Sequence, residues 1–176
     1  MAFNGDVCRD LAAHVLALAE RQGGAVPLII GHRVMGVTLL HTGDFAESRA
    51  HLDRAFALYD PIEHRALATR FATDPGVGIL AFRSWVMWHL GYPEAALADA
   101  DRALQDAREF SQAVFALSVT AWTQIFCGNY AAASSRESEL VALADEKGTA
   151  WWKALGTWSQ GVLFVLALLL HQDRAT

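Results

Sequence analysis

Apolar residues recur along this chain at the three- and four-residue spacing of helices that pack through one face. Leu11, Val15 and Leu18 form one such stripe, which ends at a Gly-Gly pair, a common helix stop. A second apolar segment runs from about Val26 to His41 and ends at Thr42-Gly43. Strand signals are weak, because no alternating run of β-branched residues is bounded by hairpin turns. The pattern therefore predicts an all-α chain of helices joined by short loops.

Two aspartates mark predicted helix starts. Asp44 precedes the third apolar segment, and Glu47 follows three residues later, so the pair has the spacing of a capping box. Asp74 precedes Pro75, which is typical of an N-cap followed by proline in the first helical turn. Pro61 is expected to end the helix that Asp44 begins.

Three glycines, Gly43, Gly91 and Gly128, mark turns around which the sequence repeats. A small residue stands seven positions before each glycine, namely Gly36, Ser84 and Ala121. Another stands five positions after, namely Ser48, Ala96 and Ala133, and the first two glycines are also followed at twelve positions by Ala55 and Ala103. Antiparallel helices approach closely only where small side chains meet, and glycine permits the tight reversal between them. The chain therefore consists of repeated helix–turn–helix pairs.

This pattern resembles the tetratricopeptide repeat, a unit of 34 residues. The matching positions are Gly36, Gly43, Phe45 and Ala55, then Gly91, Ala96 and Ala103, then Gly128, Tyr130 and Ala133. A further first helix carries Trp152, Leu155 and Gly156 at the W-x2-L-G positions. The resemblance implies a TPR-like right-handed α-solenoid of antiparallel helix pairs, with about eight helices in one domain.

The repeat spacing predicts an insertion. Gly43 and Gly91 are 48 residues apart, 14 more than one repeat, and the excess corresponds to residues 61–74, where His64 to Phe71 could form a short extra helix. The expected organisation of residues 1–176 is a helix at 6–22, a repeat at 27–60, the insertion at 61–74, repeats at 75–109 and 111–147, and a terminal helix at 149–171.

A second resemblance covers roughly Asp6 to Gly161. The insertion is similar to that in the repeat region of large bacterial proteins that carry an adenylate/guanylate cyclase-type domain and a signal-transducing ATPase domain. The matching residues are Tyr59, Asp60, Pro61, His64, Arg65, Asp74, Pro75 and Gly76. This resemblance implies an interaction or scaffold region of a cytoplasmic signalling protein, whose partner is a protein, a peptide or another domain of a parent chain. No catalytic residue of a cyclase or an ATPase is present to carry over.

Charge and hydropathy exclude other partners. The net charge is −5 and no Lys/Arg cluster occurs, so we expect no binding to nucleic acid. Val162 to Leu170 is a run of nine apolar residues, whereas a membrane-spanning helix needs roughly 20. We therefore expect no membrane span. Cys8 and Cys127 lie outside any CxxC pair and are expected to be half-buried thiols in a reducing cytosol.

Catalytic and metal-binding patterns are also missing. The seven histidines include no HExxH motif and no pair four residues apart, which helical ligands need. Ser134-Ser135 is expected to face solvent, and Glu137 and Glu139 should point in different directions. We expect no enzymatic activity, no cofactor and no metal.

The chain has six tryptophans, all between Trp85 and Trp158. In tetratricopeptide-like repeats, the first helix of each pair lines a concave groove, and several of these tryptophans fall on the predicted first helices. The repeat positions expected to bind a partner there are Arg33, Val37, His41, Trp85, Trp88, His89, Phe115, Trp122, Phe126, Lys153 and Thr157. Aromatic side chains suit a surface that receives a helix or an extended peptide.

Three alternatives remain open at this stage. The rings could simply bury one another in a tightly curled solenoid. The groove could close into a pocket and act as a small-molecule sensor. The apolar helix Val162–Leu170 could pair two copies of the chain as a homodimer, because a terminal repeat normally needs a polar outer face.

Overall fold

The chain is all-helical in the computed structural model, which describes residues 4–71, 73–109 and 113–172. Helix covers 89% of the structure, and the described residues contain no strand. The long helices are α1 (Gly5–Gln22), α2 (Ala25–Thr42), α3 (Phe45–Leu58), α6 (Pro75–His89), α7 (Pro93–Glu109), α8 (Ala113–Phe126), α9 (Tyr130–Glu146) and α10 (Ala150–Gln172). Residues 61–71 form α4 (Pro61–His64), the 3₁₀ turn η1 (Arg65–Leu67) and α5 (Ala68–Phe71).

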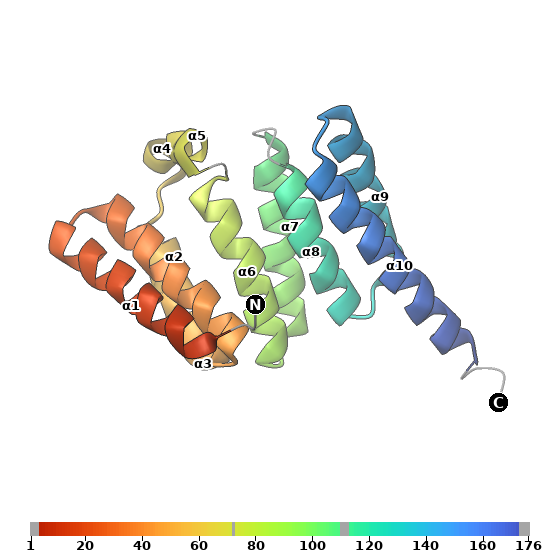
Figure 1. Cartoon of the computed structure of the whole chain (residues 1–176), viewed down its shortest axis with the longest axis horizontal. Helices are drawn as coiled ribbons and strands as arrows, with labels where there is room; N and C mark the ends of the chain where they lie inside the picture. Colours follow the sequence, from red (N-terminus) through yellow and green to blue (C-terminus); the bar gives the residue numbers. More distant parts are fainter. Residues whose placement is uncertain (1–3, 72, 110–112, 173–176) are drawn as a thin grey trace.

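Consecutive helices pack side by side along one row, from α1 at one end to α10 at the other (Figure 1). α2 packs on α3, α6 on α7 and α8 on α9, and each pair contacts the next through α3 with α6 and α7 with α8. The helices α2, α6, α8 and α10 also contact one another in that order. These four helices therefore share one side of the row, on which residues far apart in sequence become neighbours.

Glycines reverse the chain at the predicted turns. Gly43, Gly91 and Gly128 have φ angles of 90°, 85° and 76°, a left-handed conformation that side chains with a Cβ rarely adopt. Gly148, with φ of 65°, makes the turn between α9 and α10, which the repeat pattern did not single out.

The predicted small residues lie where helices approach most closely. A Cβ on Gly36 would lie 2.7 Å from Cγ of Leu52, and the Ser48 hydroxyl donates a hydrogen bond of 2.7 Å to the carbonyl oxygen of Gly36. The hydroxyls of Ser84 on α6 and Thr123 on α8 lie 2.7 Å apart. The predicted alanines at 55, 96, 103, 121 and 133 are fully buried. Small side chains therefore set the spacing within the helix pairs and between them.

One predicted cap is confirmed and the other is wrong. Asp74 caps α6, since its carboxylate accepts hydrogen bonds from the backbone N–H groups of Gly76 and Val77 at 2.8 and 3.2 Å. Asp44 stands at the N-cap position of α3, but its side chain makes no capping hydrogen bond. Its carboxylate instead pairs with Arg9 of α1, a residue whose proximity local spacing could not reveal.

The segment at 61–74 leaves the row and returns to it. In place of one short helix over His64 to Phe71, it forms two four-residue helices joined by a 3₁₀ turn. Its two ends contact each other, because the Tyr59 hydroxyl donates a 2.8 Å hydrogen bond to Asp74. The Tyr59 ring also packs on Gly76, where an added Cβ would lie 2.5 Å from Cε1 of the ring. The insertion therefore leaves the packing of α3 on α6 undisturbed.

Both end helices expose apolar side chains. On α1 these are Val7, Leu11, Val15 and Leu18, and on α10 they are Trp151, Trp158, Phe164, Val165, Leu168 and Leu169. By length and apolar composition alone, Ala25–Thr42 and Ala150–Leu169 could cross a membrane, but helices that pack in a protein core pass the same test. The expectation of no membrane span stays a prediction.

Candidate functional site

Aromatic rings from α6 and α8 meet on the side of the row that these helices share. We call Phe82, Trp85, Trp88, Phe115, Trp122 and Phe126 the aromatic face. The Phe126 ring is central, with centroids 4.9 Å from Trp88, 5.8 Å from Trp85 and 6.1 Å from Trp122. Phe82 links Trp85 to Phe115, at 6.0 and 5.9 Å. All six rings therefore form one connected set across two helices.

Further rings continue this set toward both ends of the row. His41 of α2 lies 6.4 Å from Phe82. His89 is exposed and stacks on Phe45 at 4.2 Å, with an angle of 7° between the ring planes. On α10, Trp152 lies 6.3 Å from Phe115 and Trp158 lies 5.6 Å from Trp122.

The rings bury one another only in part. All six members of the aromatic face are half-buried, so each keeps some surface in contact with solvent. The Trp85 indole N–H donates a 2.9 Å hydrogen bond to the carbonyl oxygen of Val119 on α8, which holds this ring in one orientation. The two readings that the sequence left open, mutual burial and an accessible aromatic surface, therefore both describe these side chains.

Arg33 and Val37 of α2 line a pocket beside the aromatic face. The cavity has a volume of about 330 Å³ and is lined by Arg33, Val34, Val37, Thr38, Thr73, Phe82 and Phe115. Among the expected site residues, the structure thus brings Arg33, Val37 and Phe115 together around one space. Phe82, which the repeat positions did not select, completes its wall.

The guanidinium of Arg33 stands close to the first turn of α6. A Cβ on Gly78 would lie 2.7 Å from Nη1 of Arg33, so a larger residue at 78 would require the end of this flexible side chain to move. Burial lowers the pKa of Arg33 from its ordinary value, while the negative charge of Asp74 opposes that change. None of the ion pairs formed by the described residues includes Arg33.

Lys153 and Thr157 are exposed and make polar contacts. The Lys153 ammonium donates a 2.6 Å hydrogen bond to Asp145 of α9, and the Thr157 hydroxyl donates to the carbonyl oxygen of Lys153 at 2.8 Å. Trp158, one residue after Thr157, occupies the place beside Trp122. A shift of one residue turns a side chain by about 100° around a helix, so Thr157 and Trp158 point in different directions.

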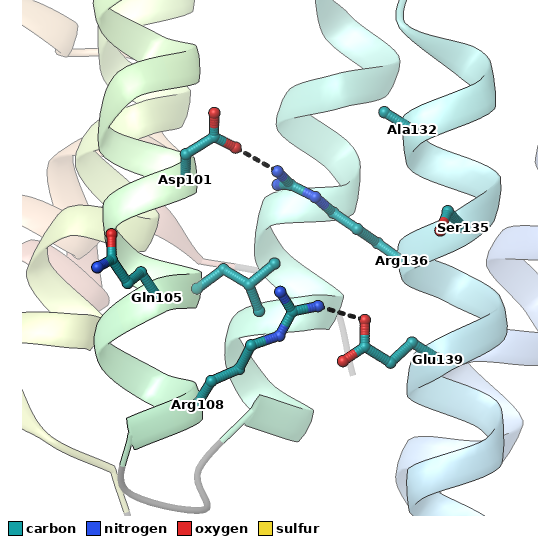
Figure 2. Close-up of a pocket in the computed structure, with 8 residues that line it drawn as sticks. Asp101, Gln105, Arg108, Ala132, Ser135, Arg136 and Glu139 are labelled. Carbon is teal, nitrogen blue, oxygen red and sulfur yellow. Dashed lines mark hydrogen bonds and ion pairs between the residues drawn. The ribbon is translucent and has the colours of Figure 1, made fainter.

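A different pocket, of about 570 Å³, lies between α7 and α9 (Figure 2). Two ion pairs cross it, joining Asp101 to Arg136 and Arg108 to Glu139. Arg136 also donates a 3.1 Å hydrogen bond to the carbonyl oxygen of Thr120. The charged side chains that line this pocket therefore already pair with each other. The aromatic face and the Arg33 pocket are the better candidates for binding.

No catalytic constellation emerges from the described residues. They contain no group of three or more His, Cys, Asp or Glu that could hold a metal ion. His32 and His51 bring their Nδ1 atoms within 2.9 Å, a contact that the search for pairs four residues apart could not find. Burial lowers the pKa of both imidazoles, and the charge of Arg54 contributes to each shift.

Glu137 is a buried acid that the sequence reading did not recognise. It is 1% exposed, whereas Glu139 pairs with Arg108 and Ser134-Ser135 is exposed, as expected. Neither carboxylate oxygen of Glu137 has a hydrogen-bond partner in the described structure. Burial raises its pKa to about 7, and the neighbouring Ser159 hydroxyl opposes part of the rise. The spacing of Ala133, Glu137, Leu140 and Ala144 could have placed it on the buried stripe of α9.

Comparisons with known proteins identify no relative: no protein-family model matches the chain, and no curated protein matches it.

Proposed function

We propose that this chain is a TPR-like right-handed solenoid that binds a helix or extended peptide of a protein partner along its aromatic face. The order of helix contacts supports the solenoid, because each pair packs on the next and α2, α6, α8 and α10 also contact in series. Left-handed turn glycines and buried small residues at the repeat positions support it further. The similarity to repeat regions of bacterial cyclase- and ATPase-type proteins favours a cytoplasmic signalling role without catalysis.

The connected, half-buried rings of α6 and α8 carry this proposal. Each ring is held by ring neighbours, so little side-chain entropy remains to be lost when a partner binds. Large, ordered aromatic surfaces dominate the energetics of interfaces, and apolar surfaces between helices receive amphipathic helices. The partner we expect therefore presents apolar side chains spaced three to four residues apart.

Selection from a random peptide library displayed on phage tests this function. We expect the purified chain to enrich peptides with apolar anchors at helical spacing, and Trp88→Ala to weaken their binding at least tenfold. Trp151→Ala is the matched control, because Trp151 is 71% exposed and lies outside the aromatic face. Equal binding by both variants and the wild type would contradict the proposal, provided that circular dichroism shows that all three are folded.

A second candidate function is recognition of a small molecule that combines an anionic group with an apolar body. The Arg33 pocket favours it, since a half-buried guanidinium with no ion-pair partner among the described residues stands next to the rings of Phe82 and Phe115. Its volume, about 330 Å³, lies at the lower end of the range for ligand sites, roughly 300–1,000 Å³.

Titration with 1-naphthoate and its neutral amide would test this candidate by calorimetry. The naphthoate should bind, the amide should bind at least tenfold more weakly, and Arg33→Gln should remove the difference between them. Equal affinity of the wild type for both compounds would refute a role of Arg33 as an anion ligand.

A further inference from the structure

The last helix, α10, has one face that is largely exposed. Its inner face packs tightly on α9, since a Cβ on Gly156 would lie 2.8 Å from Cγ2 of Val141. Its outer face carries Trp151, Trp158, Phe164, Val165, Leu168 and Leu169, each between 51% and 71% exposed. Figure 1 shows that its C-terminal turns reach beyond the helices on which it packs. Exposed apolar surface on this scale marks an interaction site.

The outer face contains a heptad seam. We give this name to Trp151, Ala154, Trp158, Gly161, Val165 and Leu168, all of which are exposed. Their spacings of three and four residues alternate, which is the pattern that lets one helix pack along another. Phe164 and Leu169 flank the seam on either side. Residues 154–169 include no charged side chain, so two copies of this face would not repel each other.

The sizes along the seam select one orientation for a second copy. Trp151, Trp158 and Val165 alternate with the smaller Ala154 and Gly161. In a parallel pair, tryptophan would face tryptophan and glycine would face glycine, which overfills some layers and leaves voids in others. The spacings between seam residues are the same from either end of the helix. Two antiparallel copies can therefore match their seam residues along the whole contact and be related by a twofold axis.

We propose that two copies of the chain pair antiparallel through this seam to form a symmetric homodimer. The layers then place Trp158 against Gly161 of the second copy, Ala154 against Val165 of the second copy, and Trp151 against Leu168 of the second copy. Each central layer thus combines a large side chain with a small one. The seam adjoins the aromatic face, because Trp158 lies beside Trp122, but the dimer does not require that a peptide be bound there.

Gly161 supplies a second, separate argument. Glycine within a helix lowers its stability relative to alanine, and it permits a neighbouring element to approach closely. Gly36, Gly76 and Gly156 each make such an approach inside the chain, but a Cβ on Gly161 would meet nothing within 4 Å. An indole from a second copy is the neighbour that would require glycine at this position.

The available area matches a weak but specific dimer. Trp151, Trp158 and Phe164 are 71%, 58% and 65% exposed, and such rings bury ~150–250 Å² each, so they offer about 400 Å². The three aliphatic side chains, Val165, Leu168 and Leu169, add on the order of 200 Å². Two copies would bury about 1,200 Å², at the lower edge of the range for specific interfaces.

Light scattering of the full chain from about 1 to 100 µM, a range that spans the dissociation constants of weak complexes, tests the dimer. The mass should rise with concentration toward twice the chain mass of 19.2 kDa. Gly161→Leu should stay monomeric and helical, because the new side chain has free space in a single copy but collides with Trp158 of the second copy. Ala142→Leu, an equally exposed change on α9, should dimerise like the wild type. The double variant Trp158→Ala/Gly161→Leu should recover dimerisation, since the large and small partners are exchanged.

Disulfide trapping tests the orientation in chains whose Cys8 and Cys127 are replaced by alanine. A mixture of Ala154→Cys and Val165→Cys chains should form a covalent dimer, and neither variant should do so alone. A monomer at every concentration, a dimer that Gly161→Leu leaves intact, or cross-linking of Ala154→Cys with itself would each overturn the proposal.

Discussion

The carboxyl group of Glu137 should make the stability of the fold depend on pH. It is buried between α9 and α10, 1% exposed and without a hydrogen-bond partner among the described residues. Burial raises its pKa from 4.5 to about 7. The folded chain therefore binds a proton that the unfolded chain releases between these values, and the stabilisation present at low pH is lost as the pH rises toward 7.

The size of this effect on the free energy of unfolding follows from the change in the pKa of Glu137. At 1.36 kcal/mol per pH unit, the change from 4.5 to about 7 corresponds to about 3 kcal/mol. Glu137→Gln keeps the shape of the side chain but cannot ionise. The variant should therefore gain about 3 kcal/mol relative to the wild type between pH 4 and pH 8.

Urea unfolding followed by circular dichroism at a series of pH values measures this difference. Comparing two proteins at each pH removes the contribution of every other titrating group. Glu139→Gln is the matched control, because Glu139 pairs with Arg108 at the surface, where ion pairs contribute little. If the stability difference between Glu137→Gln and the wild type did not change with pH, the assignment of Glu137 as a neutral buried acid would be wrong.

Two further substitutions test the packing and the capping. Gly36→Ala should destabilise the chain by about 1–3 kcal/mol, because the added methyl would lie 2.7 Å from Cγ of Leu52; an unchanged urea midpoint would contradict the close approach of α2 and α3. Asp74→Ala should cost about 1–2 kcal/mol, since it removes the cap of α6 and the acceptor for the Tyr59 hydroxyl. Tyr59→Phe should cost less, and a larger loss for Tyr59→Phe than for Asp74→Ala would show that the cap is unimportant.

Local patterns predicted the helices well because each boundary depends on nearby residues. Gly43, Gly91 and Gly128 adopt the left-handed turns expected of them, and Asp74 caps α6 through the backbone of the next residues. Small residues seven before each turn predicted the close approaches for the same reason. The Gly36 contact with Leu52 lies within one helix pair, whereas Ser84 also reaches Thr123 on α8 of the next pair.

The candidate site was harder to predict because its contacts join distant residues. Asp44 turns to Arg9 instead of capping α3, and no local spacing indicates that partner. The position of Trp158 beside Trp122 depends on how α10 rotates against α8, which the repeat positions alone did not indicate. Phe82 was missed as a pocket wall because it joins the site only when α2, α6 and α8 come together.

The most direct test of peptide binding by the aromatic face is fluorine NMR of the chain labelled with 5-fluorotryptophan. The six tryptophans give separate probes, assigned by single Trp→Phe substitutions. Titration with a peptide selected by the wild-type chain should shift the resonances of Trp85, Trp88 and Trp122 and leave that of Trp151 unchanged. Shifts confined to Trp151, or saturation by the peptide with none of the first three resonances moving, would contradict the account.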